Sequence, residues 1–223
     1  STMNDLTLVQ QYLLCAVSDS GKLTNLHSER MICFLAGGLL TLELAGCVAP
    51  AEKKKVSVAA PLPETLDDLR PMYDFIAQKG PVKPEKVAEE FYLGMTSKKF
   101  DQLFNAVGER LAAQGLAEAG GPGLLGGRKS FKPAKQAVDQ VVELLRAELL
   151  EDAPITEDAA ALAVLLDQSG CIKTYFSPYE RKSIREKRKA LSQSETGKLV
   201  EDMMCFVEDL VSAMAALTVL NNI

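Results

Sequence analysis

The chain has no tryptophan, a single histidine and only five cysteines among its 223 residues. His27 alone cannot form a histidine-based metal site, and no two cysteines have the spacing of a zinc-binding pair. The cysteines lie mostly inside apolar runs, so they are expected to be small core residues in a reducing cytosol. These are Cys15, Cys33, Cys47, Cys171 and Cys205. The sequence therefore predicts neither a metal site nor another cofactor.

A strong charge of one sign is also missing. The chain carries 25 lysines and arginines against 30 aspartates and glutamates, a formal net charge of −5. No general affinity for nucleic acid or anionic lipid follows from this balance, so either kind of binding needs a local basic patch. The segment STMNDLTLVQQ has no charged leader ahead of an apolar stretch, so no signal peptide is expected. We interpret the chain as cytoplasmic, with peripheral attachment to the inner face of a membrane left open.

The longest apolar run, MICFLAGGLLTLELAGCVA at 31–49, is long enough to be considered as a membrane span. Glu43 inside the run would cost about 2.5 to 3.5 kcal/mol near the centre of a bilayer. Gly37 and Gly38 weaken a helix, and no second run of this kind exists. The lysines at 53–55 resemble a positive-inside anchor and keep the membrane alternative open. A helix that is apolar on all sides is also typical of the centre of a helical domain, and this is the prediction for the run.

Helical periodicity dominates the remainder of the chain, because apolar residues recur three and four positions apart. Further helices are expected near 6–17, 64–78, 84–94, 97–115, 133–152, 155–170, 177–193 and 199–217. Alternation in KKKVSVAA at 53–60 predicts a short strand. The predicted fold class is a single all-α domain over 3–223, in which amphipathic helices surround the apolar central helix. One or two small β-hairpins complete it.

Three hydroxyl residues are predicted to begin helices as N-caps. Ser97 and Thr156 each precede a helical pattern. Ser177 and Glu180 form the S-x-x-E capping box, with Pro178 as the first helical residue.

The glycine-rich segment at 120–127 matches G-x-G-x-x-G, which binds a pyrophosphate only between a strand and a helix. A helical pattern precedes the segment, so it is interpreted as the tip of a hairpin over 116–131. With the helices at 84–94 and 97–115, this hairpin resembles a winged-helix DNA reader. The cations that would then contact phosphates are Lys98, Lys99, Arg110, Arg128 and Lys129.

The helix expected over 180–190 is strongly basic. It could be a binding surface for anionic lipid or for an acidic protein partner. The alternative is that it is only a solvated helix face without a binding role. The residues of this predicted surface are Arg181, Lys182, Arg185 and Arg188. No nucleophile in the chain has a base arranged beside it, so no catalytic residue is assigned and an enzyme is not expected.

The order of the segments resembles the Golgi phosphoprotein 3 family, which is built on the GPP34 domain. The similar segments are LTLVQQYLLCAVSDSGKL, LLTLELAG, a lysine-bearing strand, and GERLAAQGL followed by a hairpin. The resemblance covers nearly the whole chain and implies a single, mainly helical domain with a very apolar central helix. It also implies peripheral membrane association through phosphatidylinositol 4-phosphate and, in eukaryotes, retention of Golgi glycosyltransferases. Short relatives without the eukaryotic N-terminal arm are bacterial, and this chain looks like one of them.

The lipid site of the family uses a tryptophan and an arginine around the start of the central helix, and two arginines on the helix that ends in ERL. These positions are occupied here by Ser28, Gly37, Asn105 and Gly108. Their replacement argues against high-affinity recognition of that phosphoinositide.

The hairpin loop of the family carries apolar residues thought to dip into the bilayer, and Leu124 and Leu125 occupy its tip here. Arg128 and Lys129 stand beside them, and from this position they are expected to contact headgroup phosphates. Further charge is expected from Lys53, Lys54 and Lys55. The leading hypothesis is a non-enzymatic protein that associates weakly with anionic membranes. An adaptor that binds an acidic protein through 180–190 is the second hypothesis, and winged-helix DNA binding is the third.

Overall fold

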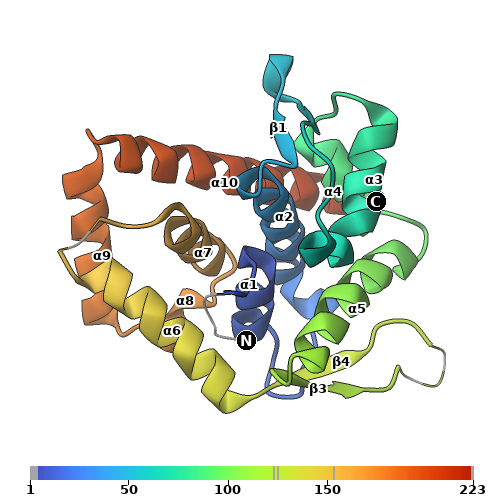
Figure 1. The fold of residues 1–223 in the computed structure, drawn as a ribbon, viewed down its shortest axis with the longest axis horizontal. Coiled ribbons are helices and arrows are strands. Elements are labelled where there is room, and N and C mark those ends of the chain that lie inside the picture. Colours follow the sequence, from blue (N-terminus) through green and yellow to red (C-terminus); the bar gives the residue numbers. More distant parts are fainter. Residues whose placement is uncertain (1–4, 123, 125, 153, 222–223) are drawn as a thin grey trace.

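The apolar run folds into helix α2 (Ser28–Leu44), in which every residue from Met31 to Leu42 is buried. The computed structural model describes residues 5–122, 124, 126–152 and 154–221. In Figure 1, α2 lies at the centre of the molecule, and it packs against α1 (Leu8–Ala16), α4 (Pro84–Tyr92), α7 (Glu157–Gln168) and α10 (Glu195–Asn221). The predicted core helix is confirmed. Within the described residues, no helix combines the length and the apolarity that a membrane span requires.

The remaining helices surround this centre, and the structure is 68% helical. They are α3 (Arg70–Lys79), α5 (Lys98–Ala113), α6 (Lys135–Leu150), the short α8 (Ile172–Tyr175) and α9 (Pro178–Leu191). In Figure 1, α6, α9 and α10 frame α7 on one side of the molecule, while α3, α4 and α5 lie on the other. The predicted fold class, a mainly α-helical domain with small hairpins, is confirmed.

Two antiparallel hairpins project from the helical body at separate places (Figure 1). The first pairs β1 (Val48–Pro50) with β2 (Val56–Val58). The second pairs β3 (Ala117–Gly120) with β4 (Ser130–Pro133). The strand expected within 53–60 is therefore present, and it is shorter than the alternating pattern.

The central helix is shorter than the apolar run that predicted it. It ends at Leu44, and the backbone of Gly46 adopts a φ of +76°, which a glycine accepts without strain. The chain then enters β1, so the apolar residues at 47–49 belong to a strand and a turn. Burial on both sides makes a strand and a buried helix look alike in sequence.

Two other local predictions were wrong in detail. The helix expected over 64–78 is divided into a 3₁₀ segment, η4 (Glu64–Leu69), and α3. Pro71 lies in the first turn of α3, where a missing N–H is tolerated, so the division follows from its geometry. Ser97 precedes α5, but its hydroxyl donates to Asp101 instead of capping the helix. Thr156 and the Ser177 capping box form as predicted.

Candidate functional site

A groove of about 1280 Å³ opens beside the second hairpin. Its walls come from the turn before α2, from the start and one face of α5, and from the β3–β4 hairpin. These segments are far apart in sequence, and the fold brings them together because α5 packs against both strands of the hairpin.

An aromatic cluster joins the base of this hairpin to the core. The ring of Phe131 on β4 lies 5.6 Å from that of Phe104 on α5, which in turn lies 6.0 Å from Phe34 on α2. A Cβ atom at Gly108 would lie 2.2 Å from the ring of Phe131, so only glycine permits this packing. Gly108, one of the four family positions, therefore has a structural role in holding the hairpin against α5.

Asn105, another of those positions, binds the backbone of the hairpin on either side of Arg128, just before β4 begins. Its Nδ2 donates to the carbonyl oxygen of Gly127 at 3.1 Å, and its Oδ1 accepts from the backbone N–H of Lys129 at 2.9 Å. The side-chain amide thus bonds the backbone just before β4, where no neighbouring strand is paired with it. It lines the groove, and its polar atoms are engaged within the protein.

Arg128 forms a nearly buried ion pair at the floor of the groove. Its Nε donates to Asp101 Oδ1 at 2.8 Å, and the side chains of Arg128 and Asp101 are 16% and 9% exposed. The guanidinium also lies over the ring of Phe100 at 4.7 Å and donates to the carbonyl oxygen of Leu23. Asp101 accepts a further bond from Ser97. Arg128 therefore joins the hairpin, α5 and the turn before α2, and its charge is compensated inside the protein.

Lys129 is more open but is also paired, with Glu109 Oε1 at 2.7 Å. Two further cations of the groove, Lys22 and Lys98, are exposed, and their ammonium groups form no ion pair or hydrogen bond in the part of the chain described. The groove thus carries four cations against two carboxylates. Arg128 and Lys129 stay predictions as headgroup ligands, while the unpaired positive charge lies on the two lysines.

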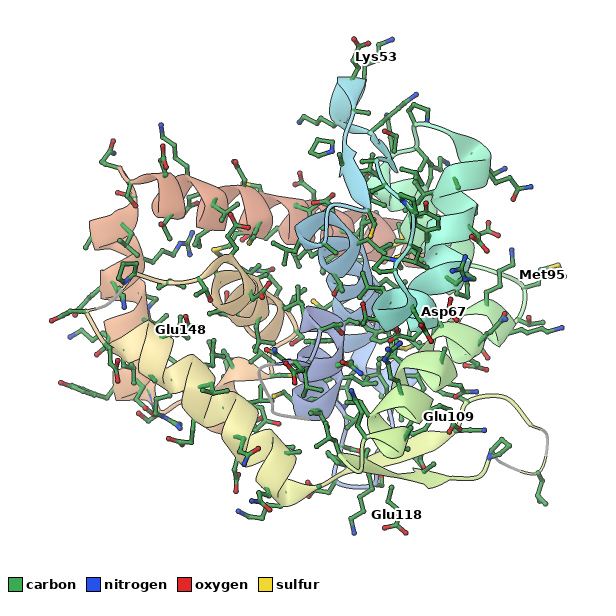
Figure 2. All side chains as sticks on the ribbon, viewed as in Figure 1. Lys53, Asp67, Met95, Glu109, Glu118 and Glu148 are labelled. Carbon is green, nitrogen blue, oxygen red and sulfur yellow. The ribbon has the colours of Figure 1, made fainter. Side chains whose placement is uncertain are left out.

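Three large apolar side chains stand almost fully exposed around the groove. Leu26, which lines it, is 90% exposed, Met95 is 106% exposed and Leu124 is 107% exposed. Met95 lies directly before Thr96 of the groove wall, and Leu124 lies in the hairpin loop whose ends, Gly121 and Gly126, line it. Figure 2 labels Met95 at the edge of the molecule, on the loop between α4 and α5. We call Leu26, Met95 and Leu124 the apolar loop triad.

The sequence indicated only the hairpin member of this triad. Leu125, its predicted companion, lies outside the described residues. Leu26 and Met95 are single apolar residues in the short polar segments TNLHS and GMTS. Such loops place side chains in solvent, which is the available signal, but one exposed apolar residue is ordinary on a protein surface. Their significance depends on the groove that their loops share, and this groove exists only in the folded chain.

The other two family positions do not join the groove. Gly37 is buried in α2, where an added Cβ would lie 3.2 Å from Leu165 of α7 and 3.8 Å from Val9 of α1. Ser28 is the first residue of α2 and is half-buried. Neither lines the groove, so the fold brings only Asn105 and Gly108 close to the hairpin.

The first hairpin carries its lysines elsewhere. Lys53 and Lys54 are exposed at its tip, and Lys55 is half-buried. Figure 2 labels Lys53 at the far end of the β1–β2 hairpin, well separated from Glu109 on the wall of the groove. These three lysines and the groove are therefore two separate basic sites.

The basic helix borders a different cavity. Arg181, Arg185 and Arg188 line it, whereas Lys182 is exposed and does not. Arg181 donates to the carbonyl oxygen of Phe176 at 2.8 Å, and Arg188 lies 2.8 Å from Glu201 of α10. Part of the predicted basic surface is thus used to attach α9 to its neighbours.

Two of the buried cysteines are unreactive as nucleophiles. Burial raises the pKa of the Cys15 thiol to about 12, and it also raises the pKa of Cys33, which keeps both sulfurs protonated. In the part of the chain that the structure describes, no three histidine, cysteine, aspartate or glutamate side chains lie close enough to hold a metal ion.

A family model matches most of the chain. The model described as Golgi phosphoprotein 3 (GPP34) matches residues 8–207, which run from the start of α1 to the middle of α10 and include both hairpins. No protein with curated annotation matches the chain.

Proposed function

Because the chain belongs to the Golgi phosphoprotein 3 (GPP34) family, we propose that it is a non-enzymatic protein that binds peripherally to anionic membranes through the apolar loop triad. Leu26, Met95 and Leu124 enter the interface, while Lys22 and Lys98 contact the headgroups. In this proposal the positive charge comes from the two lysines, which have no carboxylate partner in the part of the chain that the structure describes. Arg128 holds the hairpin in place.

One observation carries the proposal: three almost fully exposed apolar side chains come from three separate loops around a single groove with excess positive charge. Burial of one such side chain contributes about 1.5 to 3 kcal/mol. A lysine near an anionic surface contributes about 1 kcal/mol. The sum is comparable to that of a single myristoyl chain, which binds membranes marginally and reversibly. A peripheral, salt-sensitive association is therefore expected.

The test is co-sedimentation with vesicles of neutral lipid, of generic anionic lipid and of lipid that contains phosphatidylinositol 4-phosphate. Leu124→Asp and Met95→Asp are each expected to lower binding to anionic vesicles by about tenfold or more. Leu144→Asp is the matched control, because Leu144 is an exposed leucine on α6 that is 48% accessible and lies outside the groove. Equal binding by the control and the two loop variants would contradict membrane insertion by the apolar loop triad.

The lipid series also tests headgroup specificity. Equal binding to both kinds of anionic vesicle is expected, because the groove presents lysines and not the four ligands implied by the family pattern. A preference of more than tenfold for the phosphoinositide would show a headgroup pocket that these residues do not explain. Failure to bind any vesicle would leave the adaptor hypothesis, which is supported by the exposed side chains of Lys182 and Arg185, both without an ion pair among the described residues.

DNA binding is less well supported by the geometry. Of the cations on α5 that the winged-helix interpretation uses, Lys99 is paired with Glu90 and Arg110 with Asp68, 3.4 Å apart. Only Lys98 is left without an ion pair in the described residues. Since charge supplies most of the affinity for DNA, little binding at physiological salt is expected.

A further inference from the structure

A second cavity, of about 250 Å³, lies beneath α9 on the side of the molecule away from the groove. Buried residues of α6, α7 and α10, including Leu149, Val164 and Met204, line it together with half-buried aliphatic side chains. The half-buried wall consists of Ile155, Ala163, Ile184, Leu191 and Val200. The cavity is therefore apolar inside.

The position of α9 explains why this space exists. No residue of α9 is buried, although Ile184 and Leu191 face the body of the protein. The helix packs against α6 and α10, which Figure 1 shows on either side of α7. Polar bonds hold it there, among them the Arg188–Glu201 pair and a bond of 2.9 Å from Lys187 to the carbonyl oxygen of Glu148. Because these polar bonds attach α9 along its edges, its apolar face is not packed closely against the body, and the cavity lies between them.

The mouth of the cavity is strongly cationic. Five basic residues line the cavity against one carboxylate, that of Asp167. The basic residues are Lys173, Arg181, Arg185, Lys187 and Arg188. The side chains of Lys173 and Arg185 are exposed and form no ion pair or hydrogen bond within the described residues. An apolar interior below unpaired cations is complementary to a molecule with an aliphatic body and an acidic end.

The volume limits the length of that body. An apolar cavity of about 150 Å³ accepts benzene, with six carbon atoms. At the same space per atom, the cavity holds roughly ten carbons of a single chain. A glycerophospholipid carries two long chains, so a ligand with one chain fits better.

We propose that this cavity binds a medium-chain fatty acid of about ten carbons, with its chain beneath α9 and its carboxylate at Arg185 and Lys173. This site is separate from the groove and does not rest on the proposed function. A fatty acid that occupied it would complete the burial of Ile184 and Leu191 and so stabilise α9 on the body.

Isothermal titration calorimetry with decanoate, kept below its micelle concentration, is the direct test. One equivalent is expected to bind. Each methylene contributes about fourfold in affinity, so hexanoate, which is four methylenes shorter, is expected to bind roughly 250-fold more weakly. Tetradecanoate is expected to stay within about threefold of decanoate, because the added carbons find no further room. Decanol and decyltrimethylammonium, with the same chain and no negative charge, are expected to bind at least about threefold more weakly.

Two matched pairs of variants test the position of the ligand. Ala163→Phe fills the cavity and is expected to abolish binding, whereas Ala215→Phe, at an exposed site of α10, is not. Arg185→Gln is expected to weaken binding by about three- to tenfold, and Lys182→Gln, on the same helix but outside the cavity, by less than twofold. Should A163F lose its helical circular dichroism, Leu191→Ala carries the test, because a larger cavity shifts the best chain length upward by two or three carbons.

Three results would overturn the inference. One is equal affinity for decanoate and decyltrimethylammonium, since the cations at the mouth would then have no role. Another is unchanged binding by folded A163F or an unchanged chain-length profile for L191A. The third is an equal loss in R185Q and K182Q, which would indicate a diffuse effect of the charge on α9. None of these results bears on vesicle binding by the apolar loop triad, so the two proposals fail separately.

Discussion

The two hairpins of this protein both carry basic residues, but they use them in opposite ways. The β3–β4 hairpin places Arg128 against Asp101, with both side chains largely buried, and rests Phe131 on Gly108. The β1–β2 hairpin holds Lys53 and Lys54 in solvent, each with a φ of 58°. Both appear in the sequence as short basic turns. The availability of a cation therefore depends on whether the fold places a carboxylate beside it.

The largest effect on stability is expected from removing one partner of the buried ion pair in the second hairpin. Arg128→Ala leaves the Asp101 carboxylate with few compensating groups, so the free energy of unfolding should fall by about 3 kcal/mol. Urea denaturation measures this change. In a double-mutant cycle, Asp101→Asn should recover part of the loss. A loss below about 1 kcal/mol would mean that Arg128 is held loosely and is available to an anionic ligand after all.

A smaller loss of stability is expected from a substitution at the contact between the β3–β4 hairpin and α5. Gly108→Ala places a methyl group within 2.2 Å of the ring of Phe131, so the hairpin has to move, at a cost of about 2 kcal/mol. Thermal unfolding followed by circular dichroism measures the effect. Gly115→Ala is not a suitable control, because Gly115 has a φ of +74°. Gly121→Ala is suitable, since nothing lies within 4 Å of its added carbon, and little change is expected.

The comparison extends to carboxylates, since Asp101 is paired with a cation and Glu43 has no cationic partner among the described residues. Burial raises the pKa of Glu43 to about 6, and its place in the last turn of α2, where the helix dipole is negative, acts in the same direction. A raised pKa means that this group favours folding below its unfolded pKa and loses that contribution as the pH rises through 6. Glu43→Gln should therefore stabilise the protein by about 1 kcal/mol at pH 7.5.

That advantage should largely disappear near pH 4, where Glu43 of the unsubstituted protein is mostly protonated in both the folded and the unfolded state. Denaturation curves at the two pH values test the sign. A stabilisation that does not depend on pH would show that the effect comes from side-chain packing and not from ionisation.

The smallest effect is expected at the tip of the first hairpin. Lys53 occupies the left-handed region, with φ 58° and ψ 39°, where glycine is less strained than lysine. Lys53→Gly should raise the free energy of unfolding by about 0.5 kcal/mol or leave it unchanged, because the unfolded chain also gains freedom. Vesicle binding should not change, since this hairpin lies apart from the groove. A loss of binding would place Lys53 at the membrane.

Features that depend on residues close together in the chain could be predicted from the sequence. They include helix α2, the N-cap at Thr156 and the capping box at Ser177. The role of Arg128 could not be predicted, because Asp101 lies 27 positions away and pairs with it only when α5 meets the hairpin. The same holds for the apolar loop triad, whose members come from three loops. Periodicity records which face of an element is apolar, but it does not record which loops become neighbours.

The burial of α2 from Met31 to Leu42 has a consequence for synthesis on the ribosome. Its partners include α1, which precedes it, and α7 and α10, which follow more than a hundred residues later. The most apolar helix therefore leaves the exit tunnel long before α7 and α10, which cover it in the folded protein, have been synthesised. Nascent chains that expose such a surface are prone to aggregate, so this one is expected to depend on a chaperone until translation passes Glu195.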